Sequence, residues 1–209
     1  MMGRAGAGIF VSFEGIDGSG KSTQARLLAE ALGRDAVLTR EPGGATGAED
    51  IRRLLVEGEP SRWSPETEIL LFTAARRDHL EKTIRPALAA GKTLISDRFA
   101  DSTRVYQGAA RASLRPLVDE LHRLMIGIEP DLTFLIDMDP GAALERGLAR
   151  RSGEDRFEEL GLEFQRALRD GFLALAQSQP NRIRVIDGAR AQDAIAAEIA
   201  AGFHAWATA

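Results

Sequence analysis

The chain reads Gly15-Ile16-Asp17-Gly18-Ser19-Gly20-Lys21-Ser22 between its first apolar run and its first helical pattern. This stretch matches G-x-x-x-x-G-K-[ST], a loop that cradles phosphates with its own backbone N–H groups. Its glycines are needed because a Cβ would block the approach to a phosphate or exclude the required φ values. Lys21 is expected to reach the β- and γ-phosphates of a nucleoside triphosphate, and the Ser22 hydroxyl to bind Mg²⁺. A purely structural turn, the alternative, would leave Lys21 without a purpose, so the loop and the adjoining Thr23 are predicted to bind ATP.

Around this loop, short apolar runs rich in β-branched residues alternate with longer segments of helical periodicity. The expected strands are Ile9–Phe13, Ala36–Thr39, Thr93–Ser96, Leu132–Asp137 and Arg182–Ile186. The expected helices are Ser22–Leu32, Pro65–Glu81, Leu114–Met125, Gly141–Arg150, Glu158–Ala176 and Ala191–His204. This alternation predicts an α/β fold in which helices flank a five-stranded parallel sheet and ligands bind at the C-terminal ends of the strands.

Composition limits the size and the partners of the protein. The 209 residues, 44% of them apolar, are expected to form a single domain, because typical domains span about 50 to 250 residues. A net charge of -4 offers no broad cationic surface, so a nucleic-acid polymer is not expected as a partner. The absence of cysteine fits a reducing compartment. No apolar stretch approaches the roughly 20 residues of a membrane span, so we expect a cytoplasmic protein without a membrane partner.

Further motifs follow the phosphate loop in a fixed order. They read F-E-G-I-D-G-S-G-K-S-T-Q from Phe13, T-R-E-P-G-G-A over 39–45, D-R-F over 97–99 and P-D-L-T-F-L-I-D over 130–137. Together they closely resemble bacterial thymidylate kinases, from Phe13 to at least Phe157. The resemblance implies a three-layer P-loop kinase fold and transfer of the γ-phosphoryl group of ATP to dTMP, giving ADP and dTDP for dTTP synthesis. It also implies Mg²⁺ and a homodimer.

Phe72 and Arg76 lie four residues apart within an expected helix, so their side chains project from one face. The helix pattern alone favours a core phenylalanine beside a solvated arginine. The resemblance implies instead that Phe72 stacks on the thymine ring and that Arg76 hydrogen-bonds its carbonyl edge. On the acceptor side it further assigns contacts to Arg40, Glu41 and Pro42.

Asp97 and Arg98 directly follow an expected strand, which places them at the ligand-binding edge of the sheet. The planar fork of Arg98 can clamp the acceptor phosphate, and Asp97 can hold the Mg²⁺ shell or orient Arg98. The alternative is an Asp-Arg pair on the surface. Asp17 sits in the phosphate loop, where a carboxylate is unfavourable unless it serves a metal or a hydroxyl. The resemblance sets Asp17 against the 3′-hydroxyl of dTMP and the magnesium shell.

Four residues that follow Arg98 come within reach of a nucleoside if residues 100–108 are helical. They are Ser102, Thr103, Tyr106 and Gln107. The resemblance implies that Tyr106 packs under the deoxyribose and excludes a 2′-hydroxyl, while Thr103 reads the base.

A charged segment, Arg150-Arg151-Ser152-Gly153-Glu154-Asp155-Arg156-Phe157, is expected to form a short lid. One variant of the family carries its catalytic arginine in the phosphate loop, where this chain has Gly18. Arginines that close over the transferring phosphoryl group would supply that charge, and we expect Arg150 and Arg156 to act with Lys21, Arg98 and Asp17 in catalysis. An exposed charged loop is the alternative.

Three other functions remain open at this point. The sequence most resembles kinases that act on dTMP. The nearest rival is a kinase of the same fold that acts on another nucleoside monophosphate or on a deoxynucleoside. An ATPase that couples hydrolysis to movement or signalling, and a nucleotide-binding module without catalysis, are the others. No general base is required, because the acceptor phosphate is already ionised. We accordingly interpret His79, His122 and His204 as ordinary surface or helix residues.

Overall fold

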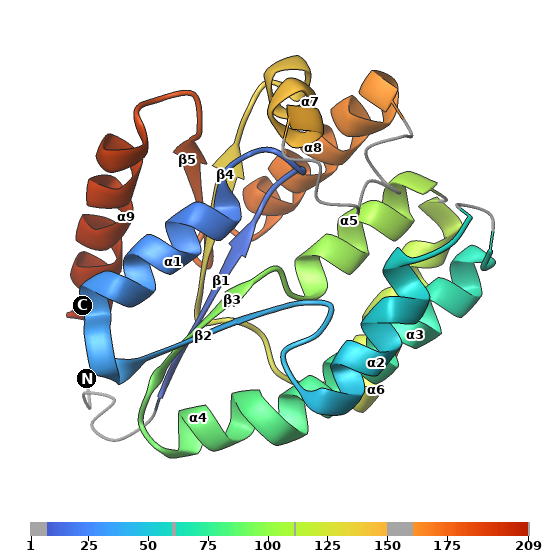
Figure 1. The fold of residues 1–209 in the computed structure, drawn as a ribbon, viewed down its shortest axis with the longest axis horizontal. Helices are drawn as coiled ribbons and strands as arrows, with labels where there is room; N and C mark the ends of the chain where they lie inside the picture. The colour runs from blue at the N-terminus through green and yellow to red at the C-terminus, as the bar shows by residue number, and fades with distance from the viewer. Residues whose placement is uncertain (1–7, 60–61, 111, 150–160, 209) are drawn as a thin grey trace.

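The computed structural model describes residues 8–59, 62–110, 112–149 and 161–208. Within them one parallel sheet is formed by the strands β1 (Ile9–Glu14), β2 (Ala36–Arg40), β3 (Thr93–Asp97), β4 (Leu132–Asp137) and β5 (Ile183–Asp187). The order of the strands is β2-β3-β1-β4-β5 (Figure 1). The predicted α/β fold with five parallel strands is confirmed, and each expected strand is present to within one or two residues.

Helices connect the strands and cover both faces of the sheet. They are α1 (Lys21–Leu32), α2 (Thr46–Val56), α3 (Pro65–His79), α4 (Arg85–Ala89), α5 (Ala100–Ala110), α6 (Arg115–Met125), α7 (Pro140–Ala149), α8 (Gly161–Ser178) and α9 (Gln192–Ala207). A π-helical turn, Leu80–Ile84, joins α3 to α4. The helical segment expected to end at Glu81 therefore continues to Ala89.

Helix α2 was not expected from the sequence. Its N-cap residue is Ala45, whose side chain cannot accept a hydrogen bond from the first turn, and only Ala48 and Leu55 of the helix are buried. Instead, the amide of Ala48 donates to Asp78 Oδ2 of α3 at 2.9 Å. Because this helix start is satisfied by a residue 30 positions further along the chain, the local sequence carries little signal for it.

Apolar side chains of β1 alternate between the two faces of the sheet. Val11 and Phe13 are fully buried in a cluster with residues of α1 and α9, which lie side by side in Figure 1. Phe10 points to the other face, where it is buried with Leu80 and Ile84 of the π-helical turn. Burial of one such side chain stabilises the fold by about 1.5–3 kcal/mol. The core therefore lies in two layers, one on each face of the sheet.

Parallel pairing brings the C-terminal ends of β1, β2 and β3 to one edge. Phe13 pairs with Asp97 between β1 and β3, and Arg40 pairs with Asp97 between β2 and β3. The amide of Glu41 then donates to the carbonyl oxygen of Asp97 at 2.9 Å. Motifs that are far apart in the sequence thus meet at a single edge of the sheet. In the described part of the chain, no helix combines the length and the apolarity needed to cross a membrane.

Candidate active site

A cavity of about 420 Å³ opens at this edge, between the phosphate loop, the loop after β2, helices α2 and α3, and the start of α5. Most residues predicted for the acceptor side line it: Asp17, Arg40, Glu41, Pro42, Phe72, Arg76, Arg98, Ser102, Thr103 and Tyr106. Gln107 does not. Its side chain is buried, and its Nε2 donates to Glu68 Oε2 at 3.3 Å. The structure therefore brings together residues from four separate motifs and leaves Gln107 outside the cavity.

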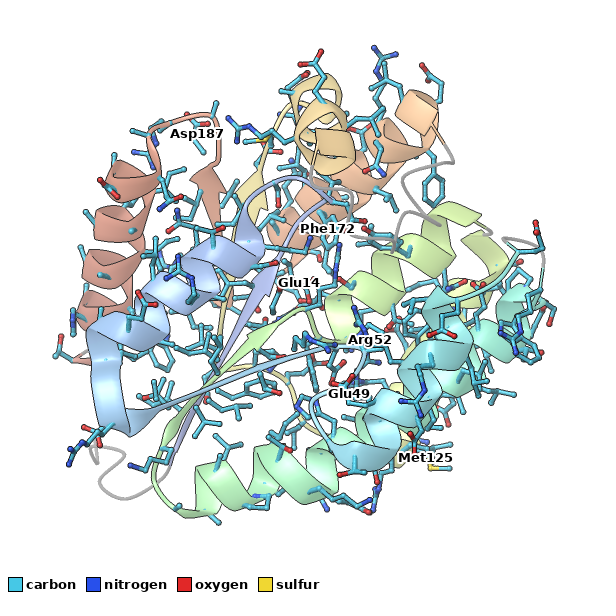
Figure 2. The ribbon with its side chains drawn as sticks, in the orientation of Figure 1. Glu14, Glu49, Arg52, Met125, Phe172 and Asp187 are labelled. Atoms are coloured by element: carbon cyan, nitrogen blue, oxygen red, sulfur yellow. The ribbon has the colours of Figure 1, made fainter. Side chains whose placement is uncertain are left out.

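Helix α2 contributes residues that the sequence reasoning missed. Arg52 and Val56 line the cavity, and Arg52 Nη1 donates to the carbonyl oxygen of Pro42 at 2.6 Å. Glu49 Oε1 accepts from the amide of Gly44 at 2.9 Å. Figure 2 labels Arg52 and Glu49 on α2, both close to the loop that they hold. No sequence signal marked these residues, since the helix that carries them was itself not expected.

The phosphate loop needs glycine at particular positions. Gly15, Gly18 and Gly20 all adopt positive φ values, between 83° and 142°. A Cβ on Gly15 would lie 2.6 Å from the carbonyl oxygen of Ile136, and a Cβ on Gly18 would collide with the carbonyl oxygen of Ala143 in α7. Helix α7 therefore occupies the space that a side chain at position 18 would need.

Lys21 is the first residue of α1 and is buried there. Its Nζ donates to the carbonyl oxygen of Ile16 and to Asp17 Oδ1, each at 3.3 Å. Burial lowers the pKa of Lys21 below its ordinary value, and the nearby Arg98 lowers it further. These two bonds hold the ammonium group against the phosphate loop, where Lys21 lines the cavity.

Arg98, Asp17 and Tyr106 form a closed triangle of hydrogen bonds. Arg98 Nη2 donates to Asp17 Oδ1 at 2.5 Å and to the Tyr106 hydroxyl at 3.0 Å, and that hydroxyl donates to Asp17 Oδ2 at 2.8 Å. Burial by itself would raise the pKa of Asp17, but the charges of Arg98 and Lys21 hold it below its ordinary value. Burial raises the pKa of Tyr106 well above 10. The triangle therefore contains an ionised carboxylate and a neutral phenol.

The backbone of Arg98 is held in an unusual conformation. Its φ of 71° lies in the left-handed region, which among the described residues only glycines share, and such strain costs about 1–3 kcal/mol. Glu14 supports this turn, because its carboxylate oxygens accept from the amide of Phe99 at 2.8 Å and from Ser102 Oγ at 2.6 Å. Burial, aided by Asp101, raises the pKa of Glu14 to about 7. The alternative of a surface Asp-Arg pair is wrong, since the Arg98 side chain is mostly buried and pairs with Asp17.

Asp97 and Ser22 are the predicted metal-binding residues, and both line the cavity. Asp97 Oδ1 is buried and accepts no hydrogen bond from the described residues. Those residues include no group of three or more acidic or histidine side chains that could hold a metal without other ligands. Mg²⁺ in phosphoryl-transfer sites is bound through one or two protein oxygens together with substrate phosphates. The orphaned oxygen of Asp97 and the hydroxyl of Ser22 fit such a shared site.

Arg76 is buried, with 5% of its surface exposed. Its Nε donates to Glu41 Oε2 at 2.7 Å, and its Nη2 donates to Thr103 Oγ1 at 2.9 Å and to the carbonyl oxygen of Phe99 at 3.3 Å. Although burial would raise the pKa of Glu41, Arg76 holds it below its ordinary value. The alternative of a solvated arginine beside a core phenylalanine is therefore wrong, since Arg76 and Phe72 both line the cavity.

The histidines need a partial correction. The sequence suggested ordinary surface or helix residues. His79 and His122 do lie in helices, but both are buried. His79 contacts Glu41 and Thr39, and His122 lies 3.1 Å from Glu129. His204 is exposed. The predicted lid, with Arg150 and Arg156, lies outside the described residues.

Comparisons with known proteins agree along nearly the whole chain. The sequence model of the family described as thymidylate kinase matches residues 13–199. A thymidylate kinase of Dinoroseobacter shibae is 72% identical over 197 residues, covering 93% of this chain and 95% of that protein. One of Ruegeria pomeroyi is 65% identical over 198 residues, covering 93% and 94%. The crystal structure of thymidylate kinase from Ehrlichia chaffeensis aligns with a TM-score of 0.76 at 37% identity, covering 94% of this chain and 99% of that one. With the motifs, the parallel sheet and these matches in agreement, the chain belongs to the thymidylate kinase family.

Proposed function

We propose how the residues of this cavity divide the work of thymidylate kinase activity, in which the γ-phosphoryl group of ATP passes to dTMP and yields ADP and dTDP. The observation that carries the proposal is the triangle of Arg98, Asp17 and Tyr106. It joins the phosphate loop, which binds the donor, to the start of α5, which lines the acceptor cavity. The reacting groups would meet at this junction.

The thymine base is read by α3 and α5. Phe72 offers a ring for stacking, and Arg76 offers the donor atoms that a pyrimidine carbonyl requires. Thr103, which accepts from Arg76, belongs to the same base-reading surface. The half-buried position of Phe72 and the full burial of Arg76 beside it support this assignment.

The sugar lies against Tyr106 and Asp17, which line the same part of the cavity. The ring of Tyr106 is packed against Phe164 and Phe172 of α8, with ring centroids 6.3 and 6.4 Å away, so it is a rigid wall. A rigid wall rejects an added 2′-hydroxyl because it cannot move aside. Asp17, with its pKa held low, is available to accept a hydrogen bond from the 3′-hydroxyl. Arg40, Glu41, Pro42 and Ser102 complete the acceptor side.

In the transfer, an ionised phosphate oxygen of dTMP attacks the γ-phosphorus in line, and the bond from that phosphorus to the oxygen bridging it to ADP breaks. No protein group needs to accept a proton. Lys21 and Arg98 neutralise the negative charge on the transferring group, which is the main catalytic contribution in this chemistry. Bound Mg²⁺ would neutralise further phosphate charge, and Ser22 and Asp97 are the residues that would hold it.

We retain the proposal of a short lid that includes Arg150 and Arg156. Support comes from the described residues at Gly18, where the contact with Ala143 leaves no space for an arginine side chain. The charge that such an arginine would provide has to come from elsewhere in the chain. We also propose a single domain over residues 1–209, supported by one family match over residues 13–199, and a cytoplasmic location, supported by a chain without cysteine.

We further propose that the protein is a homodimer, formed through one apolar face. The exposed apolar side chains of this dimer face are Leu54, Leu70, Leu117, Leu124 and Met125. They come from α2, α3 and α6. Helix α3 packs against both α2 and α6, and the three helices lie together in Figure 1. Exposed apolar side chains that gather on adjacent helices are typical of a surface that binds another protein. A second copy related by a two-fold axis would cover them with the same surface.

The reaction is tested by measuring ADP formation from ATP and Mg²⁺ with each of several acceptors in turn. We expect dTMP to be the best acceptor, ahead of dUMP, UMP, CMP, AMP, GMP and thymidine, because Phe72, Arg76 and Tyr106 act together on base and sugar. A higher rate with another acceptor would contradict the substrate assignment. ATP turnover that no acceptor changes would contradict the proposed transfer.

A further inference from the structure

We propose that His79 is a positioning residue for the acceptor base, which acts through Glu41 to fix the guanidinium group of Arg76 in the cavity. The inference rests on the proposed role of Arg76 at the base. His79 itself does not line the cavity.

His79 is completely buried, at the last residue of α3. Both of its ring nitrogens have partners. Nδ1 lies 3.0 Å from Glu41 Oε1, and Nε2 lies 2.7 Å from Thr39 Oγ1. These two residues belong to β2 and the loop after it, about 40 positions earlier in the chain, so His79 connects the base-reading helix to the opposite wall of the cavity.

Glu41 transmits this contact to Arg76. Its two carboxylate oxygens are divided between two donors, because Oε1 faces His79 and Oε2 accepts from Arg76 Nε. Only 5% of Glu41 is exposed. A buried carboxylate that loses one donor must reorient or recruit another, because leaving it unsatisfied is costly. Removal of the His79 donor would therefore draw Glu41 away from its present position.

One nitrogen of the Arg76 guanidinium group makes no hydrogen bond with the described residues. Nε donates to Glu41, and Nη2 donates to Thr103 and to the carbonyl oxygen of Phe99. Nη1 makes no hydrogen bond with any described residue. Because the guanidinium is planar and rigid, fixing Nε and Nη2 also fixes the direction of Nη1. Nη1 is therefore the donor available to a base, and its aim depends on Glu41 and, through Glu41, on His79.

The loop after β2 is built directly on the His79 ring. Gly44 has a φ of 84°, and a Cβ there would lie 2.5 Å from His79 Nε2. Thr83, one helical turn beyond His79 and within the π-helical turn, donates from Oγ1 to the carbonyl oxygen of Gly44 at 2.7 Å. π-helical turns occur often at functional sites. The imidazole thus supports the backbone that carries Glu41 as well as its carboxylate.

Two substitutions separate the role of each ring nitrogen. Asn can place an amide donor near the position of Nδ1, and Gln can place one near Nε2. We expect His79→Asn to keep the donor to Glu41 but to lose the contact with Thr39, and so to raise the KM for dTMP only about two- to threefold. We expect His79→Gln to raise the KM for dTMP about tenfold and to reduce the preference for dTMP over dCMP about tenfold. The KM for ATP and the kcat at saturating dTMP should stay within about twofold in both.

A matched control tests whether loss of any buried hydrogen bond has the same effect. Thr133 of β4 shares a buried hydrogen bond of 2.7 Å with Ser12 Oγ, and it does not line the cavity. Thr133→Val should lower the melting temperature without changing the KM for dTMP or the base preference. A merely structural role for His79 would make His79→Gln behave like Thr133→Val, and that result would overturn the inference.

Arg76→Lys separates this inference from the proposed base site. If Arg76→Lys leaves the KM for dTMP and the base preference unchanged, the base-reading role of Arg76 fails and the His79 inference fails with it. If Arg76→Lys raises the KM for dTMP and reduces the base preference while His79→Gln changes neither quantity, only the His79 inference is wrong. If His79→Gln does not fold, Thr39→Val removes the partner of Nε2 alone. It should raise the KM for dTMP two- to threefold, roughly the effect of one hydrogen bond, and an unchanged KM would overturn the inference.

Discussion

The Tyr106 hydroxyl donates to Asp17 Oδ2 at 2.8 Å, which links the middle of α5 to the phosphate loop 89 residues earlier in the chain. Because Arg98 Nη2 binds both partners, movement of any one of the three groups would disturb the other two. The donor side and the acceptor side of the cavity are therefore mechanically coupled. This coupling predicts that substitutions at Tyr106 affect more than the sugar.

Tyr106→Ala should weaken discrimination between dTMP and the corresponding ribonucleotide by about tenfold or more, because the rigid wall beneath the sugar is lost. Tyr106→Phe keeps the ring and should keep that discrimination, but it removes the bond to Asp17 and should lower kcat. The ratio of kcat/KM values for the two nucleotides measures the effect. A Tyr106→Ala variant that rejects the ribonucleotide as strongly as wild type would refute the role of the ring.

Arg98→Lys should lower kcat by about 10²-fold, because a lysine cannot reproduce the planar fork that binds Asp17, Tyr106 and the transferring group. The KM for ATP should change little. Steady-state kinetics with both substrates varied provide the measurement. Arg26→Lys, at an exposed residue of α1 paired with Glu30, is the control and should match wild type. Equal kcat values in the two variants would exclude a catalytic role for Arg98.

Glu14 should make stability depend on pH. Its pKa is about 7 in the folded protein against an ordinary 4.5, so the folded state keeps a proton that the unfolded chain loses within this window. The free energy of unfolding should therefore fall as the pH rises through the window, by about 3 kcal/mol at most, and should level off above it. Urea denaturation of wild type and Glu14→Gln across the window isolates the effect. A difference between the two proteins that is constant with pH would contradict the prediction.

Gly18→Ala should destabilise the fold more than Gly33→Ala. Both glycines have positive φ values, of 83° and 62°, but a Cβ on Gly33 would meet nothing within 4 Å, whereas one on Gly18 would collide with Ala143. We expect a cost of about 1–2 kcal/mol for the backbone strain at Gly33 and at least twice that at Gly18. Thermal unfolding without nucleotide measures both. Equal losses would mean that α7 moves aside, and position 18 could then accept a side chain.

Leu70→Glu should disrupt the proposed dimer, because it places a charge on the dimer face. Light scattering after size exclusion should give about twice the chain mass of 22.6 kDa for wild type and a lower mass for the variant. Val185→Glu, at an exposed apolar residue of β5 away from that face, is the matched control and should remain dimeric. A wild-type protein that is monomeric at micromolar concentration would contradict the proposal.

The strands and the phosphate loop were predictable from the sequence because their signals are local, whereas most residues around the cavity were assigned through the resemblance to thymidylate kinases. Apolar periodicity marks β1 within six residues, and the glycines of the loop encode its backbone conformations directly. The pattern of strands and helices then implies parallel pairing, and parallel pairing brings Arg40, Asp97 and the phosphate loop to one edge. The order of motifs along the chain was therefore sufficient to place the site at this edge of the sheet.

Other features depended on contacts between distant segments, and only the tertiary structure decided them. Helix α2 begins where Asp78, rather than any neighbour, satisfies its amide groups, so its residues Arg52 and Val56 could not be placed at the cavity beforehand. His79 looked ordinary because its partners Thr39 and Glu41 become neighbours only when α3 packs under the loop after β2. Local conformational preference and hydrophobic periodicity are properties of a segment and can be read from it. The partner of a buried polar group is chosen by packing, and that choice exists only in the folded chain.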